Sequence, residues 1–454
     1  MSADTSIANT GANGSNNSGN TAGGATSLIT AQAVCKTYTT GESAGRLVLD
    51  HIDFSLREGE IVAILGKSGS GKSTFLRILS GLTEPSGGEV DYRGQRVEGP
   101  AHGIAMVFQS FALFPWLTVL GNVELGLEAQ GVPRDERQKR AVAAIDLIGL
   151  DGFESAYPKE LSGGMRQRVG FARALVVNPD VLLMDEPFSA LDVLTAETLR
   201  GDLIDLWLAK RVPTKGIIIV SHNIEEAVEI ADRIIIFGSN PGCIRNEIPI
   251  NLPRPRAQTD PAFRRVVDEV YTLMTTVPGG TEAARRRAEP IGVGYRLPDA
   301  SIQQLGGLLE ALSNPPYEGR ADLPKLAESE HLGTEELVIL IEALQLLGFA
   351  QVGGGDIEAL PAGREFAAAD LQRRKQIFAD HMRRNIPLAA HIRRVLDERP
   401  GHAAPEGRFL AELEDYLSEE DAAKVFETVI NWGRYAELFA YDYDSGIVSL
   451  ENPS

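Results

Sequence analysis

The sequence has few cysteines and no long apolar run, and its acidic side chains outnumber its basic ones. Its two cysteines, Cys35 and Cys243, allow neither a disulfide framework nor a clustered zinc site. No stretch approaches the roughly 18 uninterrupted apolar residues of a membrane-spanning helix, so we expect no integral membrane protein. The formal net charge of −19 repels polyanions and disfavours nucleic acid as a partner. We therefore expect a protein of a reducing cytosol, with two or three domains in 454 residues.

Changes in composition along the chain predict four segments. Residues 1–27 are mostly Gly, Ser, Asn, Thr and Ala, which predicts a disordered tail without the basic start or apolar core of a signal peptide. Residues 28–277 alternate short apolar runs with helical stretches, as in an α/β fold with a buried, largely parallel sheet. Residues 278–300 are predicted to be a linker, and residues 301–454 a mainly helical second domain. Residues 291–454 hold 15 Lys and Arg and 28 Asp and Glu, so most of the net negative charge lies there.

A glycine-rich loop follows the apolar run IVAIL and precedes a helical stretch. It has the pattern GxxxxGK[ST], which in this context is a nucleotide phosphate loop. We expect its backbone N–H groups and the following helix start to bind phosphate, Lys72 to reach the β and γ oxygens, and the hydroxyl of Ser73 to bind Mg²⁺. The residues predicted to bind ATP here are Gly66, Ser68, Gly69, Ser70, Gly71, Lys72, Ser73 and Thr74.

A second motif, VLLMDEP at residues 181–187, ends a predicted buried strand with two carboxylates. Open α/β sheets bind ligands at the carboxyl ends of their strands. Asp185 is therefore expected to hold Mg²⁺ through water. Glu186 is expected to act as the general base that polarises the attacking water.

A third segment, LSGGMRQR at residues 161–168, opens a long helix with small residues and so offers a second helix start that favours an anion. With this segment the chain resembles the ATP-binding subunit of ABC transporters over residues 30–250. The resemblance implies a P-loop NTPase cassette made of a RecA-like core, an antiparallel β subdomain and a helical signature subdomain.

Other markers of the family are present in the expected order. Tyr38 resembles the aromatic residue that stacks on adenine, although an ordinary strand residue is the alternative. Gln109 resembles the Q-loop glutamine, a catalytic and Mg²⁺-binding residue, and His222 resembles the switch histidine at the γ-phosphate. The resemblance also assigns to ATP binding the signature and D-loop residues Ser162, Gly163, Gly164 and Asp192.

The resemblance further implies partners and a location. Each ATP would lie between the phosphate loop of one cassette and the signature of a second, head-to-tail cassette. The stretch QSFALFPWLTV at residues 109–119 would receive a helix of an integral membrane permease subunit; core packing is the alternative. A solute-binding protein would take part indirectly, and the subunit would be peripheral, at the cytoplasmic face of the inner membrane.

Several segments resemble in sequence the importer cassettes of the nitrate, sulfonate and taurine group. This resemblance implies import of a small anion such as nitrate, a sulfonate, taurine or bicarbonate. The alternative is a soluble ABC-type ATPase that is not coupled to transport. Such proteins usually have two cassettes in one chain or a long insertion, whereas about 90 residues separate Lys72 from Ser162 here. The sequence also has a single complete GxxxxGK[ST] pattern.

Residues 322–360 predict a helix, a turn, a helix and a hairpin, the order of a winged helix, with Thr334 as N-cap and Gly348 as the end of the second helix. Winged helices usually read DNA with that second helix. Residues 334–347 contain three glutamates and no Lys or Arg, so we expect protein contact or regulation, with nucleic acid binding as the alternative. A second winged unit is predicted nearer the C-terminus. The region resembles the C-terminal AAA-associated domain.

Overall fold

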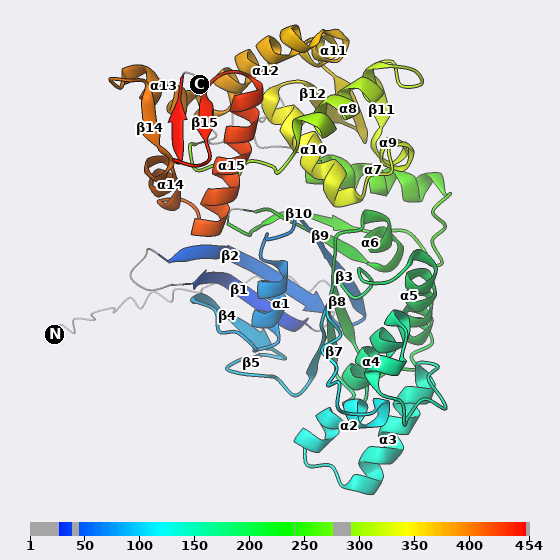
Figure 1. The fold of residues 1–454 in the computed structure, drawn as a ribbon. Helices are drawn as coiled ribbons and strands as arrows, with labels where there is room; N and C mark the ends of the chain where they lie inside the picture. Colours follow the sequence, from blue (N-terminus) through cyan, green and yellow to red (C-terminus); the bar gives the residue numbers. More distant parts are fainter. Residues whose placement is uncertain (1–26, 39–44, 240, 276–291, 451–454) are drawn as a thin grey trace, which may run out of the picture.

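The structure is a computed structural model that describes residues 27–38, 45–239, 241–275 and 292–450 (Figure 1). The predicted tail lies outside the described residues except for Ser27, which already belongs to the first strand. Most of the predicted linker, residues 278–300, also lies outside them. Within the part of the chain that is described, no helix combines the length and the apolar character needed to span a membrane.

The central sheet has six strands in the order β10-β9-β3-β8-β7-β6, parallel except for β10. These strands are β3 (Glu60–Leu65), β6 (Ile104–Val107), β7 (Val181–Asp185), β8 (Gly216–Ser221), β9 (Arg233–Phe237) and β10 (Ile244–Pro249). Every residue of β3, β7, β8 and β9 is buried, which explains why these strands are continuous apolar runs. Because β3, β7 and β8 run parallel, the segments that follow them meet at one edge of the sheet.

A second, antiparallel sheet has the order β2-β1-β4-β5. It consists of β1 (Ser27–Tyr38), β2 (Arg46–Arg57), β4 (Gly87–Tyr92) and β5 (Gln95–Arg96). Helix α1 (Lys72–Leu79) packs between the two sheets through Phe75, whose ring centroid lies 5.6 Å from those of both Phe54 on β2 and Phe237 on β9. The helix that follows the phosphate loop is thereby fixed against both sheets.

Helices form the third part of the cassette. They are α2 (Val119–Ala129), α3 (Arg134–Leu147), the 3₁₀ turn Pro158–Glu160, α4 (Gly163–Leu175), α5 (Val193–Leu208) and α6 (Ile224–Ile230). In Figure 1, α2 and α3 lie at the end of the molecule farthest from the C-terminal region. The three-part P-loop cassette expected from the sequence is confirmed.

The C-terminal region contains two units with the same order of strand, helix, helix, strand, strand, and each forms a three-stranded sheet, β11-β13-β12 and β14-β16-β15. The first comprises β11 (Arg320–Asp322), α9 (Leu323–Ser329), α10 (Thr334–Leu347), β12 (Ala350–Gly353) and β13 (Asp356–Ala359). The second comprises β14 (Ala403–Pro405), α14 (Glu406–Glu414), α15 (Glu419–Tyr435), β15 (Ala440–Asp442) and β16 (Ile447–Ser449). The remaining helices are α7 (Pro261–Thr275), α8 (Ile302–Ser313), α11 (Pro361–Ala368), α12 (Leu371–Asn385) and α13 (Pro387–Glu398).

Both predicted winged units are therefore present, with one correction at a helix start. Gly333, rather than Thr334, is the N-cap of α10, and no side chain caps that end. Gly348 ends the helix in the left-handed conformation, with φ 75°, as predicted.

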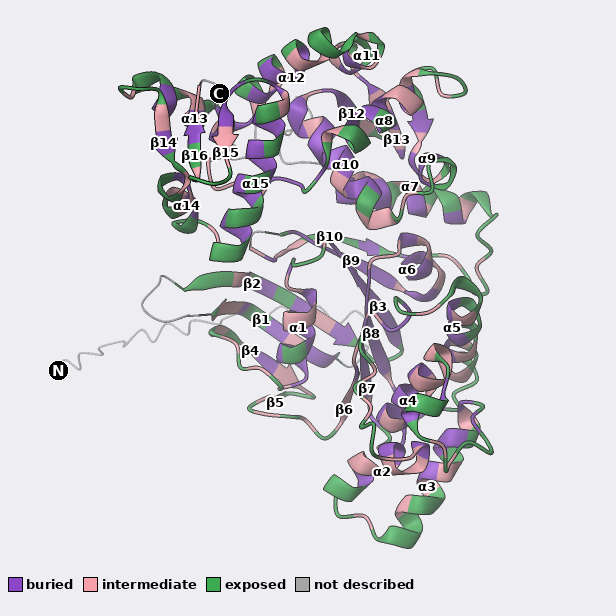
Figure 2. Cartoon of the chain, in the orientation of Figure 1, coloured by how far each residue is buried: buried purple, intermediate pink, exposed green. Residues whose placement is uncertain are grey.

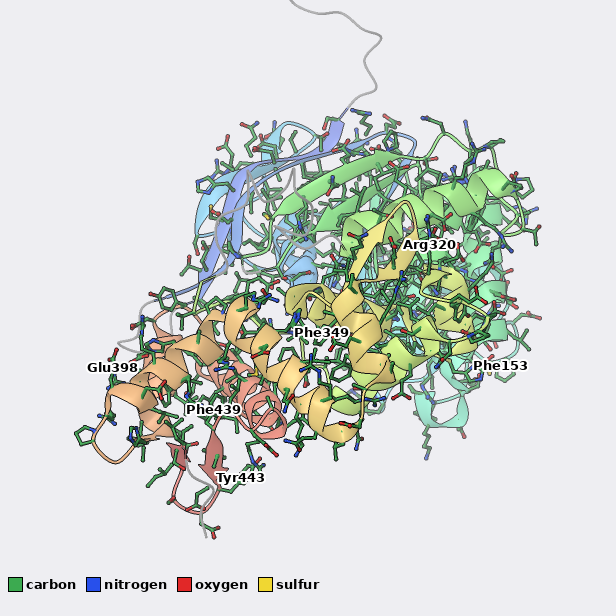
Figure 3. The ribbon with its side chains drawn as sticks, turned by 90° about the horizontal axis from the view of Figure 1, so that it is seen from above. Phe153, Arg320, Phe349, Glu398, Phe439 and Tyr443 are labelled. Atoms are coloured by element: carbon green, nitrogen blue, oxygen red, sulfur yellow. The ribbon has the colours of Figure 1, made fainter. Side chains whose placement is uncertain are left out.

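Aromatic side chains form the centre of the C-terminal region. Phe349, labelled in Figure 3, is fully buried after α10. Its ring centroid lies 5.3 Å from that of Phe366 on α11 and 6.0 Å from that of Phe378 on α12. Figure 2 shows buried residues along the inner sides of these helices. These rings belong to an apolar core that also includes buried residues of α7 and of the cassette.

The C-terminal region lies over the cassette on the side of β2, β9 and β10 (Figure 1). Helix α7 packs against α6 of the cassette and against α9, α10 and β12. Gln345 on α10 donates to the carbonyl of Thr275 at 2.8 Å. On the other side, Arg46 on β2 pairs with Asp421 on α15 at 2.5 Å.

Candidate functional site

The predicted phosphate loop joins β3 to α1 and requires glycine for steric reasons. Gly69 and Gly71 have φ of 75° and 92°, a region that side chains rarely tolerate. A Cβ atom on Gly66 would lie 2.9 Å from the carbonyl oxygen of Phe237, and one on Gly71 would lie 2.6 Å from Leu49 Cδ2. These positions therefore require glycine, and the absence of a side chain there leaves the backbone open to a phosphate group.

Two side chains of the loop fit an anionic ligand. Lys72 is buried, and its Nζ donates to the carbonyls of Gly66 at 2.7 Å and Lys67 at 2.9 Å. Burial lowers the pKa of Lys72, and nearby carboxylates, Glu186 first, oppose that shift. The hydroxyl of Ser70 is buried and has no hydrogen-bond partner, an arrangement that a polar ligand would satisfy.

The predicted magnesium ligands lie at the end of β7 and the start of α1. Ser73 Oγ donates to Asp185 Oδ1 at 2.8 Å, so the two oxygens that would share a metal are already adjacent. Burial raises the pKa of Asp185, the bond from Ser73 opposes this shift, and the charge of Glu186 adds to it. A hydroxyl and a carboxylate oxygen are ligands that suit Mg²⁺. Gln109, also predicted as a metal ligand, binds Glu186 in this structure.

Glu186 stands at the centre of a small hydrogen-bonded group. Its Oε2 accepts from Gln109 Nε2 at 2.9 Å and lies 3.6 Å from His222 Nδ1. The interaction with His222 lowers the pKa of the Glu186 carboxyl and raises the pKa of the imidazole. The backbone N–H of Glu186 donates to Val220 O at 3.0 Å, which ties this residue to β8. The carboxylate is thus kept ionised, as a general base requires.

Tyr38 ends β1, and 43% of its surface is exposed. The ammonium group of Lys36 lies 4.9 Å from the centre of its ring. An exposed aromatic face is what adenine stacking needs. The stacking role itself stays a prediction.

The signature and D-loop residues form a second group. Ser162 caps α4 by accepting from the N–H of Met165 at 3.3 Å. A Cβ on Gly164 would lie 2.4 Å from Thr195 Cγ2, and Thr195 Oγ1 donates to Asp192 at 2.7 Å. A Cβ on Gly163 would lie 4.0 Å from Cδ2 of Leu191, next to Asp192 in the chain. Among the described residues, no hydrogen bond or ion pair joins the start of α4 to the phosphate loop, so the two predicted phosphate sites are separate in one chain.

Two residues that the sequence did not single out hold the loop after Gln109. Asn122 is fully buried; its side chain accepts from the N–H of Phe114 at 2.8 Å and donates to the carbonyls of Phe114, Leu117 and Thr118. Arg173 donates to the carbonyls of residues 111 and 112, which both have positive φ. The partners of Asn122 are backbone groups, which every residue has, so no sequence pattern could have indicated these hydrogen bonds.

The tip of that loop exposes apolar side chains. Trp116 is 70% exposed and Phe114 41% exposed, with ring centroids 5.3 Å apart. The alternative that this stretch is simply core packing is wrong for these two side chains.

Acidic residues of α10 also reach the site, a contact that we did not predict from the sequence. Glu335 Oε1 accepts from the backbone N–H of Ser68 at 3.0 Å, and Glu342 forms an ion pair with Lys67. More than 260 residues separate the partners of each pair. A contact between segments so far apart has no local pattern that would predict it.

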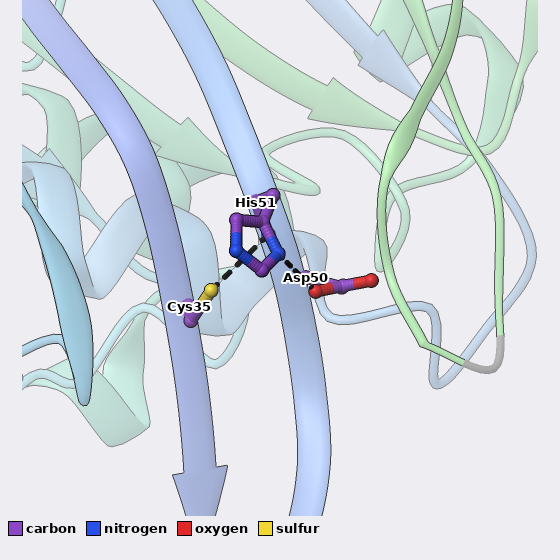
Figure 4. Close-up of side chains that lie close together, drawn as sticks. All are labelled: Cys35, Asp50 and His51. Carbon is purple, nitrogen blue, oxygen red and sulfur yellow. Dashed lines mark hydrogen bonds and ion pairs between the residues drawn. The ribbon is translucent and has the colours of Figure 1, made fainter.

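One further group of side chains has the spacing of metal ligands. Ligand atoms of Cys35, Asp50 and His51 all lie within 4.8 Å of one another on β1 and β2 (Figure 4). His51 Nδ1 already pairs with Asp50 at 2.5 Å, and 75% of the histidine side chain is exposed. This ordinary surface ion pair accounts for the arrangement, and we assign no metal to it.

The sequence is similar to known proteins in both of its regions. A family described as ABC transporter matches residues 49–189, and a family described as C-terminal AAA-associated domain matches residues 324–442. The nitrate import ATP-binding protein NrtD of Synechocystis is 44% identical over 243 residues, which cover 52% of this chain and 90% of that protein.

Two further relatives have other solutes in their names. The taurine import ATP-binding protein TauB of Sinorhizobium fredii is 39% identical over 54% of this chain and 93% of its own length. The aliphatic sulfonates import ATP-binding protein SsuB of Bacillus cereus is 42% identical over 49% of this chain and 86% of its own length. These relatives are 39–44% identical to this chain and matched over 86–93% of their length, and they show that the chain belongs to the ABC transporter family of ATPases, with a C-terminal AAA-associated domain.

Proposed function

We propose that this protein is the ATP-hydrolysing subunit of an ABC importer for a small anion such as nitrate, a sulfonate, taurine or bicarbonate. The observation that carries the proposal is the group at the carboxyl ends of β7 and β8, where Ser73 meets Asp185 and where Gln109 and His222 both adjoin Glu186. Import and the solute class rest on the relatives, whose names include nitrate, taurine and aliphatic sulfonates.

The proposed reaction is attack of water on the γ-phosphate of ATP, which breaks the bond between the β- and γ-phosphates and releases ADP and inorganic phosphate. Backbone N–H groups of the loop and the start of α1 bind the phosphates. Lys72 must exchange its present carbonyl partners for phosphate oxygens. Glu186 accepts a proton from the water, and His222 donates a hydrogen bond toward the γ-phosphate. Bound Mg²⁺, held by Ser73 and Asp185, would neutralise charge on the phosphate oxygens.

We propose a second cassette as the partner that completes the site. The helix start at Ser162 and Gly164 favours an anion, and among the described residues no hydrogen bond or ion pair joins it to its own phosphate loop, which supports a role toward the ATP of another copy. Pairing of this kind makes the association depend on the γ-phosphate, because release of phosphate removes charge-assisted contacts across the interface.

We propose that the exposed loop around Trp116 binds the permease. Phe114 and Trp116 are an apolar pair on a loop that Asn122 fixes, and a fixed apolar surface suits a partner helix. This contact would hold the subunit at the cytoplasmic face of the membrane. The solute-binding protein would act through the permease.

Substitution of the loop lysine and of the proposed base tests the function. We expect Lys72→Ala to abolish tight ATP binding and turnover, because the β and γ oxygens lose their cation. Glu186→Gln should keep ATP binding and lose cleavage by a factor of about 100 or more, since amides are not bases at neutral pH. ATP binding and phosphate release measure both outcomes.

The matched control is Lys139→Ala on α3, an exposed lysine away from the site, which should behave as the unmodified protein. Full ATPase activity in the Lys72 or the Glu186 variant would contradict the assignment.

A further inference from the structure

Helix α10 of the C-terminal domain contacts the phosphate loop directly. Glu335, in its first turn, accepts a hydrogen bond from the backbone N–H of Ser68 at 3.0 Å. Glu342, two turns further along, pairs with Lys67. We call these two interactions the α10 contact. In both, a carboxylate oxygen accepts from a donor group of the proposed phosphate loop, the N–H of Ser68 or the ammonium group of Lys67.

The α10 contact is supported by neighbouring residues. Tyr295 donates a hydrogen bond to Glu342 Oε1 at 2.6 Å, and the residue Glu342 is only 8% exposed. Arg296 pairs with Asp421 of α15 at 2.9 Å, and its guanidinium nitrogen lies 3.2 Å from the position of a Cβ on Gly69. The segment before α8 therefore reaches the loop together with α10.

This segment is anchored in the C-terminal domain. The indole N–H of Trp432, on α15, donates to the carbonyl of Ala300 at 2.8 Å, and Trp432 is fully buried. Asp421 also pairs with Arg46 on β2. A line of polar side chains thus follows the phosphate loop and β2. It contains Glu342 and Asp421 from the two winged units and Arg296 from the segment before α8, and we call it the polar seam.

Glu335 also lies near the switch histidine. Its carboxylate accepts from the N–H of Ser68 in the loop and lines one cavity with His222 and Asn223 of the cassette. A carboxylate in this position can take a donor of the loop that a phosphate group would otherwise take.

Beside the α10 contact, a cavity of about 600 Å³ lies between the switch residues and the C-terminal domain. It is lined by His222 and Asn223 from the cassette and by residues that include Asp299, Gln304 and Glu336 from the other side. The two domains are therefore not packed together at this place, and polar domain interfaces permit relative motion.

We propose that α10 is an intramolecular competitor of ATP, with Glu335 and Glu342 taking phosphate-binding groups of the loop and holding the cassette in a low-turnover state. The proposal rests on the proposed function, since it names the regulation of the same site. ATP and α10 bind the loop in alternation. The partner cassette must also approach ATP from the open side of the loop, so α10 has to leave before two cassettes can pair.

Neutralising the two carboxylates tests this proposal. In the full chain, Glu335→Gln together with Glu342→Gln should raise the affinity for Mg²⁺-ATP by about tenfold and raise basal ATPase activity, because each charge-assisted interaction with the loop is weakened. The affinity is measured by calorimetry on chains that also have Glu186→Gln, so that ATP is not consumed, and turnover is measured with Glu186 intact.

The matched control is Glu328→Gln with Glu330→Gln, which changes the net charge equally at two exposed residues of the same winged unit. It should leave both quantities unchanged. If the Glu335 and Glu342 variant binds ATP no more tightly than the control, or more weakly, the proposal is wrong.

Hydrogen exchange provides a second measurement that needs no substitution in α10. With Glu186→Gln, addition of ATP should speed amide exchange in residues 334–347 as α10 leaves the loop, and AMP should not. Unchanged exchange under saturating ATP would overturn the proposal. Lys72→Ala separates this failure from failure of the proposed function, because a Lys72 variant that binds ATP normally contradicts the nucleotide site itself.

Discussion

Glu186 and His222 are the residues whose chemistry is most dependent on each other. Their side chains are 3.6 Å apart, and each holds the other in its charged form. The raised pKa of His222 contributes stability that is complete below the ordinary pKa of about 6.5 and is lost as the pH rises through the folded value. The lowered pKa of Glu186 contributes stability that is present above about 4.5 and is lost as the pH falls through its folded value.

This pair predicts a shifted titration of one histidine. The imidazole of His222 should titrate above 6.5, and Glu186→Gln should move its pKa downward, because the neighbouring anion is removed. NMR of the ring protons against pH measures both values. Equal titration of His222 with and without Glu186 would contradict the pairing.

The residues of the site differ in how far sequence could identify them. Lys72, Ser73, Asp185 and Glu186 lie in short motifs next to apolar runs, so their positions at strand ends follow from local pattern. Glu335 and Glu342 lie on a helix whose acidic character predicted protein contact or regulation rather than nucleic-acid binding, but that pattern named no partner for either side chain. Their contact with the loop depends on how two domains pack, which no local spacing encodes.

The loop between β6 and α2 is held in its conformation by one buried polar side chain, that of Asn122. Asn122 makes four hydrogen bonds to backbone groups of residues 114–118, in place of a regular secondary structure. The strands could be predicted from uninterrupted apolar runs, and the winged units from helical spacing followed by a glycine-rich turn. The predicted position of the α10 N-cap was wrong by one residue, because Gly333, just before Thr334, takes the extended conformation that an N-cap needs.

Removal of the Asn122 side chain should loosen this loop. Asn122→Ala leaves the N–H of Phe114 and the carbonyls of Phe114 and Leu117 without this partner, while the carbonyl of Thr118 still accepts from the backbone N–H of residue 122. We expect the free energy of unfolding to fall by about 2–4 kcal/mol. Urea unfolding measures the loss. Gln130→Ala, an exposed residue at the end of α2, is the control and should change the stability little. We also expect weaker permease-stimulated ATPase activity in the Asn122 variant, because Phe114 and Trp116 lose their fixed position.

In the whole molecule, the C-terminal domain reaches the phosphate loop through polar contacts. Glu335 and Glu342 interact with the loop, and Asp421 pairs with Arg46 on β2. Elsewhere, buried apolar residues of the cassette, of α7 and of the C-terminal domain belong to one core. Under the proposed regulation, ATP binding and the α10 contact are alternatives of one equilibrium, so the domain restrains ATP hydrolysis until ATP displaces α10.

The association state of the Glu186→Gln protein shows whether ATP joins two cassettes and whether α10 opposes that pairing. Sedimentation is measured with saturating and with limiting Mg²⁺-ATP and with ADP, both for this variant and for the chain that also has Glu335→Gln and Glu342→Gln. We expect a dimer with ATP, a monomer with ADP, and dimer formation at a lower ATP concentration once the two α10 carboxylates are neutral. The same mass with either nucleotide, in both proteins, would rule out pairing of two cassettes by ATP.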